Sequence, residues 1–243
     1  MNAKEHYANQ LGNFYSWMLS DWKTKESEFR EFLISKSLAP KKKNLAIDLG
    51  AGNGIQTLAL SKLGYQVIAV DFNQQLLSEL KENAKLENQS IQIVEADILS
   101  VSQFRLEHPS LLVCCGDTLL HLSSKEEIEE FLKSCFDCLN QNGDLLLSFR
   151  DYSITLEGDS RFIPVKSDSS RILTCILDFE GDRIRVTDQL LEKQNDVWKL
   201  SISSYFKVRL LKEECLVILE TIGFQIEWVD FYQRMITILA KKK

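Results

Sequence analysis

Short apolar runs alternate with amphipathic segments along the first two thirds of the chain. Five runs have the length and the continuous apolar character that are typical of buried parallel strands. They are predicted at residues 45–49, 67–70, 91–94, 111–115 and 144–149. Helical spacing of apolar residues between the runs predicts βαβ units, and hence a doubly wound, mostly parallel sheet covered by helices on both faces.

Local signals set the bounds of several of these helices. One helix is expected to begin near Gly54, and another to cover 73–86, where leucines recur at helical spacing. Ser123 or Ser124 can cap a third helix, because glutamates follow three residues later. The Asn142-Gly143 pair is expected to stop that helix.

After Tyr152 the pattern changes from buried runs to longer extended segments. Gly and Asx turns separate three such segments, which predicts an antiparallel insertion. A helix and two further strands then end the chain. The three extended segments, the helix and the two strands are predicted at 171–180, 183–193, 197–208, 212–221, 224–229 and 235–240.

Residues 1–36 are expected to be helical and are rich in aromatic side chains. We find no repeat, no low-complexity stretch and no obvious linker, so a single domain over 1–243 is predicted. Its parts are a helical N-terminal segment (1–40), an α/β core (44–152), an antiparallel insertion (153–209) and a C-terminal helix with two strands (210–243).

Composition narrows the class of protein. The formal net charge of -6 gives no general attraction for nucleic acid. No apolar run approaches the ~20 residues that span a bilayer, and the first ten residues are too polar for a signal peptide. A cytoplasmic protein without a nucleic-acid or membrane partner is therefore expected. Cys135 and Cys138 form a CxxC within a predicted helix, but no second pair follows, so we expect core packing and no metal site.

The most informative segment follows the first predicted strand. Glycines there let the backbone turn sharply and approach a ligand closely, and the next helix offers its N-terminus to an anion. The glycines are spaced GxGxG, which differs from the GxGxxG of dinucleotide enzymes. The segment is Asp48-Leu49-Gly50-Ala51-Gly52-Asn53-Gly54.

Acidic residues also end the second and third predicted strands. Asp71, followed by Phe72, lies about 20 positions beyond the glycine loop, where a carboxylate can accept hydrogen bonds from ribose hydroxyls. Asp97, followed by Ile98, occupies the same place after the third strand. Since an NAD enzyme needs no acid at Asp97, a nucleotide-dependent dehydrogenase is disfavoured.

Together, these three features resemble the class I S-adenosylmethionine (SAM)-dependent methyltransferases. The resemblance covers residues 45–99. It implies a seven-stranded sheet with an antiparallel last strand, SAM as cofactor and S-adenosylhomocysteine as product. It also implies that Asp97 binds the adenine amino group, that Ile98 packs on the ring, and that Asp48, Gly50, Ala51, Gly52 and Asn53 belong to the cofactor loop.

Two later segments are similar to the glycine N-methyltransferase branch of that family. Cys115-Gly116-Asp117 begins a loop that ends in His121-Leu122, and Phe149-Arg150-Asp151-Tyr152 follows the fifth strand. The resemblance places Cys115 and Gly116 beside the cofactor, and Asp117, His121, Arg150 and Tyr152 around the acceptor. It implies that Arg150 binds a substrate carboxylate. Asp117 and Asp151 both stand where the branch has Asn.

The N-terminal segment adds a cover for this site. Phe14-Tyr15-Ser16-Trp17-Met18 resembles the lid that closes over SAM in the same branch, which implies that Tyr15 and Trp17 contact the cofactor. The insertion and the N-terminal helices would together form the roof that selects the substrate.

The sequence thus predicts methyl transfer from SAM to a small-molecule acceptor, an amine or an amino-acid-like nitrogen, by direct in-line displacement. Either Asp117 or His121 can serve as the base. Two alternatives stay open: a SAM-binding regulatory protein without transferase activity, and an O-methyltransferase that acts on an apolar small molecule. The oligomeric state is not predicted.

Overall fold

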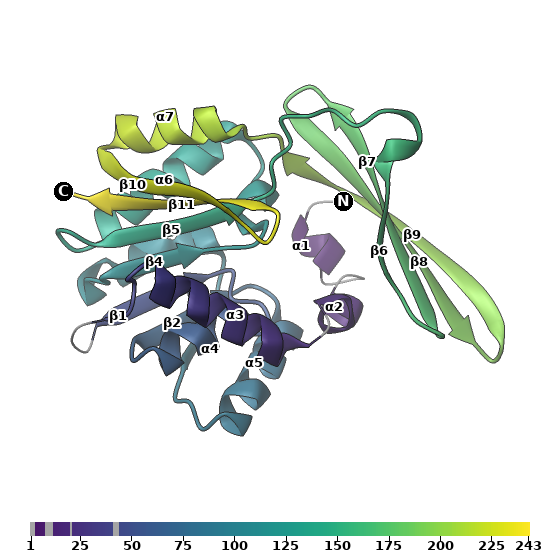
Figure 1. The fold of residues 1–243 in the computed structure, drawn as a ribbon, viewed down its shortest axis with the longest axis horizontal. Coiled ribbons are helices and arrows are strands. Elements are labelled where there is room, and N and C mark those ends of the chain that lie inside the picture. The colour runs from purple at the N-terminus through teal and green to yellow at the C-terminus, as the bar shows by residue number, and fades with distance from the viewer. Residues whose placement is uncertain (1–2, 8–11, 20, 41–43) are drawn as a thin grey trace.

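The computed structural model describes residues 3–7, 12–19, 21–40 and 44–243. Its larger part is a seven-stranded sheet in the order β10-β11-β5-β4-β1-β2-β3 (Figure 1). Five strands are parallel, and β11 pairs antiparallel with both β5 and β10. The strands are β1 (Leu45–Leu49), β2 (Gln66–Asp71), β3 (Gln92–Glu95), β4 (Leu111–Cys114), β5 (Asp144–Phe149), β10 (Phe224–Tyr232) and β11 (Met235–Lys242). The predicted sheet with its antiparallel last strand is confirmed.

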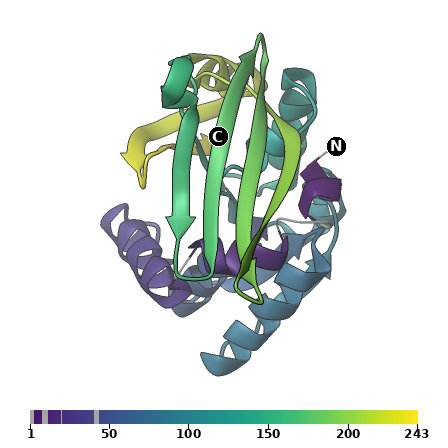
Figure 2. The same ribbon diagram turned by 90° about the vertical axis from the view of Figure 1, so that its right-hand side faces the viewer.

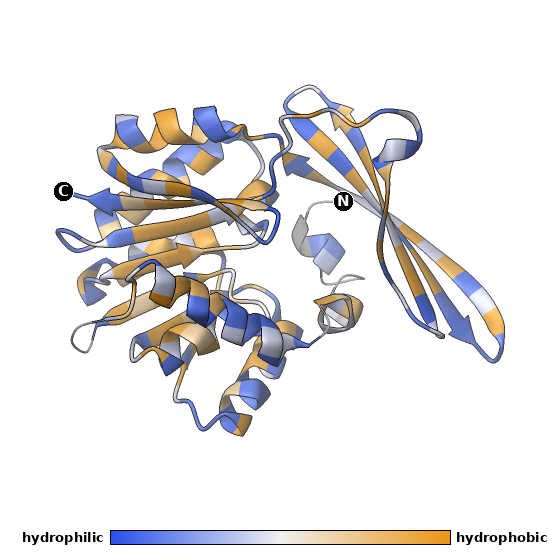
Figure 3. Ribbon diagram, in the orientation of Figure 1, coloured by the Kyte–Doolittle hydropathy of each residue, from blue (hydrophilic) through white to orange (hydrophobic). Residues whose placement is uncertain are grey.

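Helices cover both faces of this sheet, as the βαβ pattern requires. One face packs against η2, α6 and α7, and the other against α3, α4 and α5. Figure 3 shows the central strands as nearly continuous hydrophobic bands, because both of their faces are buried. The helices are α3 (Trp22–Ser35), α4 (Ile55–Lys62), α5 (Gln74–Leu86), the 3₁₀ helix η2 (Ile98–Glu107), α6 (Lys125–Cys138) and α7 (Lys212–Ile222).

Capping explains where the predicted helices begin and end. Asn73 accepts a hydrogen bond from the Leu76 amide at the start of α5, and Ser124 accepts one from the Glu127 amide at the start of α6. The predicted stop at Asn142-Gly143 is too late, because α6 already ends at Cys138. The 3₁₀ helix η2, whose N-cap is Asp97, was not predicted.

The predicted insertion forms a second sheet, with the strand order β6-β7-β8-β9. It enters the chain between β5 and α7, and Figure 2 shows it standing across one end of the core. All pairings in it are antiparallel, and its first strand was not predicted. The strands are β6 (Phe162–Ser167), β7 (Arg171–Glu180), β8 (Arg183–Gln194) and β9 (Val197–Val208).

The N-terminal segment divides into two parts with different positions. The short helices α1 (Ala3–His6) and α2 (Gly12–Leu19) lie between the second sheet and the core (Figure 1). In contrast, α3 packs on the main sheet through Phe29, Phe32 and Leu33. The lid predicted over 1–40 is therefore confined, among the described residues, to the first two helices.

Candidate functional site

The glycine loop joins β1 to α4 and depends on glycine at several positions. Gly50, Gly52 and Gly54 have φ angles of +81°, +54° and +95°, in the left-handed region that favours glycine. A Cβ on Gly50 would lie 2.4 Å from the Thr118 Cγ2 atom. The loop therefore lies directly against the segment that follows β4, and no side chain fits between them.

Asp48 lies on β1 just before this loop and connects the strand to α4. Its side chain is buried and accepts a hydrogen bond of 2.6 Å from the Thr57 hydroxyl on α4. Burial raises the pKa of Asp48 to about 7. This contact ties the end of β1 to the first turns of α4 and gives Asp48 a structural position behind the loop.

Asp71 lies at the end of β2 and faces the same loop. Its Oδ2 accepts a hydrogen bond of 2.8 Å from the Gly52 amide, and its Oδ1 accepts one of 2.8 Å from the Asn73 amide. Burial raises its pKa, although the amide hydrogen bonds oppose this shift. A carboxylate offers about four acceptor sites, so these amide contacts leave Asp71 some capacity for a further donor.

One cavity collects most of the residues predicted to bind a cofactor. The carboxyl ends of β1, β2 and β3 meet there, as in other open α/β sheets. Tyr7, Leu76, Thr118, His121 and Leu122 also line this cavity, which we call the first cavity. The predicted cofactor residues on its wall are Tyr15, Gly50, Gly52, Asp71, Phe72, Asp97 and Ile98.

The other predicted cofactor residues lie behind the wall of the first cavity, as the described residues define it. Ala51 and Cys115 are buried in the core. The Gly116 amide donates to the Ser148 hydroxyl at 2.9 Å. The Asn53 amide group donates to the Ser16 hydroxyl of α2 at 3.1 Å, and this contact fastens the lid to the glycine loop.

The lid reaches the first cavity through two tyrosines. The Tyr7 ring packs edge-on against Phe72 and His121, at centroid distances of 5.8 and 5.5 Å. The Tyr15 ring lies 3.7 Å from the point where a Gly52 Cβ would be. Burial, with Asp71 nearby, raises the pKa of Tyr15 to about 12, so its hydroxyl is protonated at neutral pH.

Other lid residues fasten the segment to the second sheet. The Trp17 indole donates to Asp168 at 2.5 Å, so this side chain faces the second sheet and not the first cavity. His6 is buried, and its ring lies 3.1 Å from Asp188 on β8 and 2.8 Å from the Ser203 hydroxyl on β9. The lid thus bridges the two sheets.

The predicted acceptor residue Asp117 is bound by two cations. Its Oδ1 accepts from the Arg150 amide at 3.0 Å, and its Oδ2 accepts from Arg150 Nε at 2.9 Å and from Lys207 Nζ at 2.7 Å. Burial raises the pKa of Asp117, but Lys207 and Arg150 outweigh burial and hold it at about 2. Asp117 is therefore a permanent carboxylate and a poor proton acceptor at neutral pH.

His121 lies between the cofactor side and the second sheet. It ends the short helix η3 (Thr118–His121), and its ring stacks on Tyr205 of β9 at 5.5 Å. Burial lowers its pKa to about 3, and the nearby Lys207 acts in the same direction, so the imidazole is neutral. Its Nδ1 is buried without a hydrogen-bond partner in the described part of the chain.

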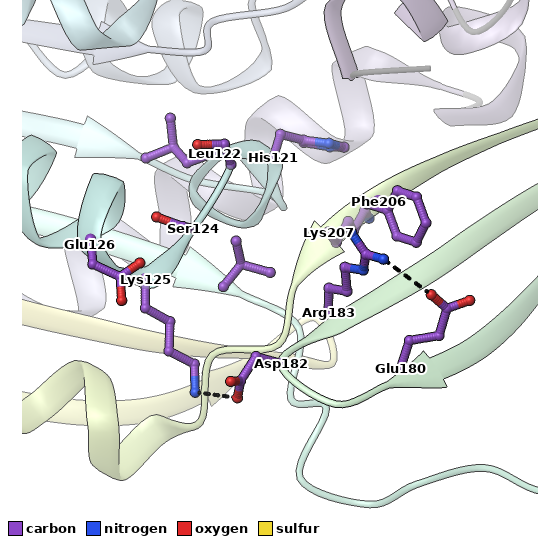
Figure 4. Close-up of a pocket in the computed structure, with 12 residues that line it drawn as sticks. His121, Leu122, Ser124, Lys125, Glu126, Glu180, Asp182, Arg183, Phe206 and Lys207 are labelled. Carbon is purple, nitrogen blue, oxygen red and sulfur yellow. Dashed lines mark hydrogen bonds and ion pairs between the residues drawn. The ribbon is translucent and has the colours of Figure 1, made fainter.

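A second cavity of about 560 Å³ opens on the other side of His121 (Figure 4). Its wall is formed by the start of α6 and by the adjoining ends of β7, β8 and β9. Polar and charged side chains dominate this wall, in contrast to the first cavity. They include Ser124, Lys125, Glu126, Glu180, Asp182, Arg183 and Lys207.

Arg150 and Tyr152 lie beside these cavities and not on either wall, as far as the described residues define the walls. The Arg150 side chain is 51% exposed and faces Asp117. The Tyr152 side chain is buried, with its ring edge-on to Phe179. Of the four predicted acceptor residues, His121 thus lines the cavities, whereas Asp117 lies outside both of these walls and contacts the second through Lys207.

Lys207 and Tyr7 are two site residues that we did not predict. Lys207 interrupts an apolar stretch of β9 between Phe206 and Val208, and its side chain is only 8% exposed. A charged residue in such a stretch is a signal that sequence inspection could have used. Tyr7 carries no such signal, because one aromatic residue among many in the N-terminal segment is not distinctive.

The described residues also bear on metal binding, on the CxxC pair and on membrane-spanning helices. Within the described ranges, no group of three or more His, Cys, Asp or Glu side chains could hold a metal ion. Cys135 and Cys138 are buried on α6, in agreement with the predicted core packing. In the same part of the chain, no helix is long and apolar enough to cross a membrane.

Comparison with known families identifies the core. Residues 46–143, which contain the glycine loop, Asp71, Asp97 and the segment around Asp117, match the family model described as a methyltransferase domain. This part of the chain is therefore similar to the class I SAM-dependent methyltransferase domains. SAM is the methyl donor of that family, as the resemblance implied.

Individual relatives agree with this similarity. The glycine/sarcosine N-methyltransferase of Aphanothece halophytica is 28% identical over 156 residues, which cover 63% of this chain and 58% of the relative. The enzyme of the same name from Parasynechococcus marenigrum is 25% identical over 142 residues, or 58% of this chain and 50% of the relative. The chain thus aligns with little more than half the length of these relatives.

Solved structures share the fold over nearly the whole chain. A SAM-dependent methyltransferase from Clostridium acetobutylicum matches with a TM-score of 0.73 and 17% identity, covering 98% of this chain and 97% of the other. An amino pentose methyltransferase from Micromonospora echinaspora, solved with SAM bound, matches with a TM-score of 0.72 and 13% identity over 92% of each chain. The second sheet and the lid therefore lie within the shared fold.

Proposed function

We propose that this chain transfers a methyl group from SAM to a nitrogen of a small, polar acceptor. The observation that carries the proposal is the place of His121, which lines both cavities. The first cavity presents the residues that suit a nucleoside, and the second presents a polar wall. His121 and its neighbour Leu122 line both cavities, and His121, with its polar ring, marks the place where the methyl donor and the methyl acceptor would meet.

The chemistry of the first cavity fits the adenosine of SAM. Asp71 has lone pairs for the ribose hydroxyls, and Asp97 stands at the end of the next strand, where the adenine edge would lie. Phe72 and Ile98 offer apolar surface for the ring. When bound, SAM supplies a methyl group that its sulfonium already activates for displacement.

The lid must move for the cofactor to enter. The first cavity measures about 80 Å³, well below the 300–1,000 Å³ of typical ligand pockets. Tyr7 narrows it by packing against Phe72 and His121. Because Tyr7 and Tyr15 come from the lid and not from the sheet, a shift of the lid would widen the cavity without disturbing the core.

The residues on the acceptor side would orient the nitrogen and exclude water. The unpartnered Nδ1 of neutral His121 can accept a hydrogen bond from an acceptor N–H and so direct the nitrogen lone pair. With a pKa of about 3 for His121 and about 2 for Asp117, neither group is a strong enough base to take up a proton at neutral pH. We therefore assign His121 to orientation, and the amine would lose its proton to water.

The character of the second cavity separates the alternatives. Its wall carries Lys125, Arg183 and Lys207 together with three carboxylates, which disfavours an apolar phenol or lipophilic alcohol as acceptor. A nitrogen acceptor agrees with the names of the two N-methyltransferase relatives. A SAM-binding protein without activity would have no use for His121 between the two cavities.

The test is production of S-adenosylhomocysteine from SAM with a panel of amines, amino acids and phenols. We expect turnover with amines and not with phenols. His121→Phe keeps a ring on Tyr205 but removes Nδ1, so kcat/KM should fall roughly 3- to 10-fold, the usual effect of one lost hydrogen bond. Calorimetry should show unchanged SAM affinity. SAM binding without turnover for every acceptor would favour the inactive SAM-binding protein instead.

A further inference from the structure

Lys207 is the most deeply buried cation on the wall of the second cavity. Its side chain is 8% exposed, whereas those of Lys125 and Arg183 on the same wall are 25% and 60% exposed. Lys125 has two carboxylate partners, Asp182 and Glu214. Water and these carboxylates can balance the charges of Lys125 and Arg183, but little water reaches Lys207.

The carboxylate that Lys207 contacts also accepts hydrogen bonds from a second cation, the half-exposed Arg150. Asp117 accepts hydrogen bonds from both Lys207 and Arg150, so two cations share one carboxylate. Asp188 on the neighbouring strand faces His6 instead. Keeping a positive charge away from water is costly unless an anion lies close to it. An anionic group in the second cavity would give the buried Lys207 ammonium a counter-ion of its own.

Arg150 is poorly placed to bind an anionic group in the second cavity, although the resemblance to the glycine N-methyltransferase branch implied that it binds a substrate carboxylate. Its amide and its Nε both face Asp117, and it lies outside the walls of both cavities as the described residues define them. Asp117 stands between Arg150 and Lys207 and holds the Lys207 ammonium in place at 2.7 Å. The buried cation that reaches the cavity, Lys207, therefore comes from the second sheet.

Lys207 and His121 are also close enough to act on one small molecule. Lys207 Nζ lies 5.8 Å from the centre of the Tyr205 ring, and the His121 ring centre lies 5.5 Å from the same point. Both side chains line the second cavity, from β9 and η3 respectively (Figure 4). An acceptor that meets both would carry its nitrogen and its anionic group on one small molecule.

We infer that Lys207 binds an anionic group of the acceptor, and that the acceptor is a small amine bearing such a group close to the reactive nitrogen. This inference rests on the proposed function. Lys207 would then decide specificity, with Asp117 as its internal counter-ion. A carboxylate and a phosphate both satisfy the ammonium, because Lys binds either as a point charge.

The experiment compares each acidic amine with its uncharged counterpart. The acceptors are glycine and glycinamide, β-alanine and β-alaninamide, and phosphoethanolamine with ethanolamine. The proteins are the unmodified chain, Lys207→Met and, as a matched control, Lys199→Met, an exposed lysine on the same strand. Turnover gives kcat/KM, and calorimetry in the presence of S-adenosylhomocysteine gives acceptor affinity without turnover.

We expect the unmodified chain to prefer the acid over its neutral counterpart roughly tenfold or more, as one charge-assisted hydrogen bond provides. In Lys207→Met that preference should fall to near unity, mainly through KM, with SAM affinity unchanged. Lys199→Met should behave like the unmodified chain. The comparison of carboxylates with phosphoethanolamine shows which anion is bound.

A second variant keeps the test informative if Lys207→Met does not fold. If Lys207→Met is unstable because Asp117 has lost one partner, Asp117→Asn/Lys207→Met removes both buried charges and should also lack the preference. A folded variant that still prefers acids, or an unmodified chain that binds acids and amides equally, would overturn the role of Lys207. Absence of turnover despite normal SAM binding would count against the proposed function instead. In that case, acceptor affinities measured by calorimetry would still test whether Lys207 binds the anionic group.

Discussion

The two sheets of this protein contribute to the candidate site in different ways. The seven-stranded sheet supplies the first cavity from consecutive strand ends, with the glycine loop after β1, Asp71 after β2 and Asp97 after β3. The four-stranded sheet supplies Tyr205 and Lys207 from within a single strand, β9. The first set is positioned by local backbone geometry, and the second by how one sheet stands against the other.

This difference suggests that the two sheets have separate functions. Changes in the core should affect the fold and the cofactor, whereas changes in the second sheet should affect the acceptor and leave the cofactor alone. His121 and the lid connect the two halves, because they contact both. Substitutions in either half should separate these two contributions.

Gly50→Ala should be the most damaging of these changes. The new Cβ would meet Thr118 at 2.4 Å and would also sit at a φ of +81°. Left-handed strain costs about 1–2 kcal/mol and overpacking about 1–3 kcal/mol, so urea unfolding should show a loss of about 2–5 kcal/mol. SAM affinity should fall with it.

Gly116→Ala is the matched control, since Gly116 has a similar φ of +79° but a Cβ added there would have no atom within 4 Å. It should lose only the strain of about 1–2 kcal/mol. Equal losses in the two variants would show that the contact between the glycine loop and Thr118 is unimportant.

Asp71→Ala should weaken SAM binding without changing the preference for acidic acceptors. It removes the acceptor for the Gly52 amide and, under the proposed function, for the ribose hydroxyls. Lost hydrogen bonds to a charged group typically cost ~1.5–3 kcal/mol, so Kd should rise roughly tenfold or more. Calorimetry with SAM measures this. An unchanged Kd in the folded variant would remove Asp71 from the cofactor site.

His121 should produce a smaller, pH-dependent effect on stability. Its folded-state pKa of about 3 lies below the unfolded value of about 6.5, so the unfolded chain binds more protons between these values. Stability contributed by neutral His121 is therefore present above pH 6.5 and is lost as the pH falls towards 3. Between pH 7 and pH 5 the loss attributable to His121 is at most about 2 kcal/mol.

Thermal or urea unfolding of the unmodified chain and of His121→Phe at both pH values isolates this contribution, because the other histidines are common to both proteins. The unmodified chain should lose more stability on acidification than the variant. Identical pH dependence in the two proteins would mean that His121 is not held neutral by burial.

The fold and the cofactor half of the site were largely predictable from the sequence. Continuous apolar runs fix parallel strands, and the loops that follow them must share one edge of the sheet. The residues Gly50, Asp71 and Asp97 therefore converge whatever the details of packing, and the structure places all three on one wall. The three longer strands of the insertion were equally visible from their turns at Gly181 and Asn195.

The surroundings of Asp117 and His121, the proposed acceptor side, depend on contacts between distant segments. Sequence alone offered Asp117 as a candidate base and Arg150 as a carboxylate-binding residue, but their mutual pairing with Lys207 depends on a strand about 90 residues away from Asp117. The neutral state of His121 likewise follows from burial beneath Tyr7 and Tyr205, which come from opposite ends of the chain. Backbone periodicity is local and can be inferred from neighbouring residues, whereas burial and charge pairing arise from distant segments whose approach no local pattern encodes.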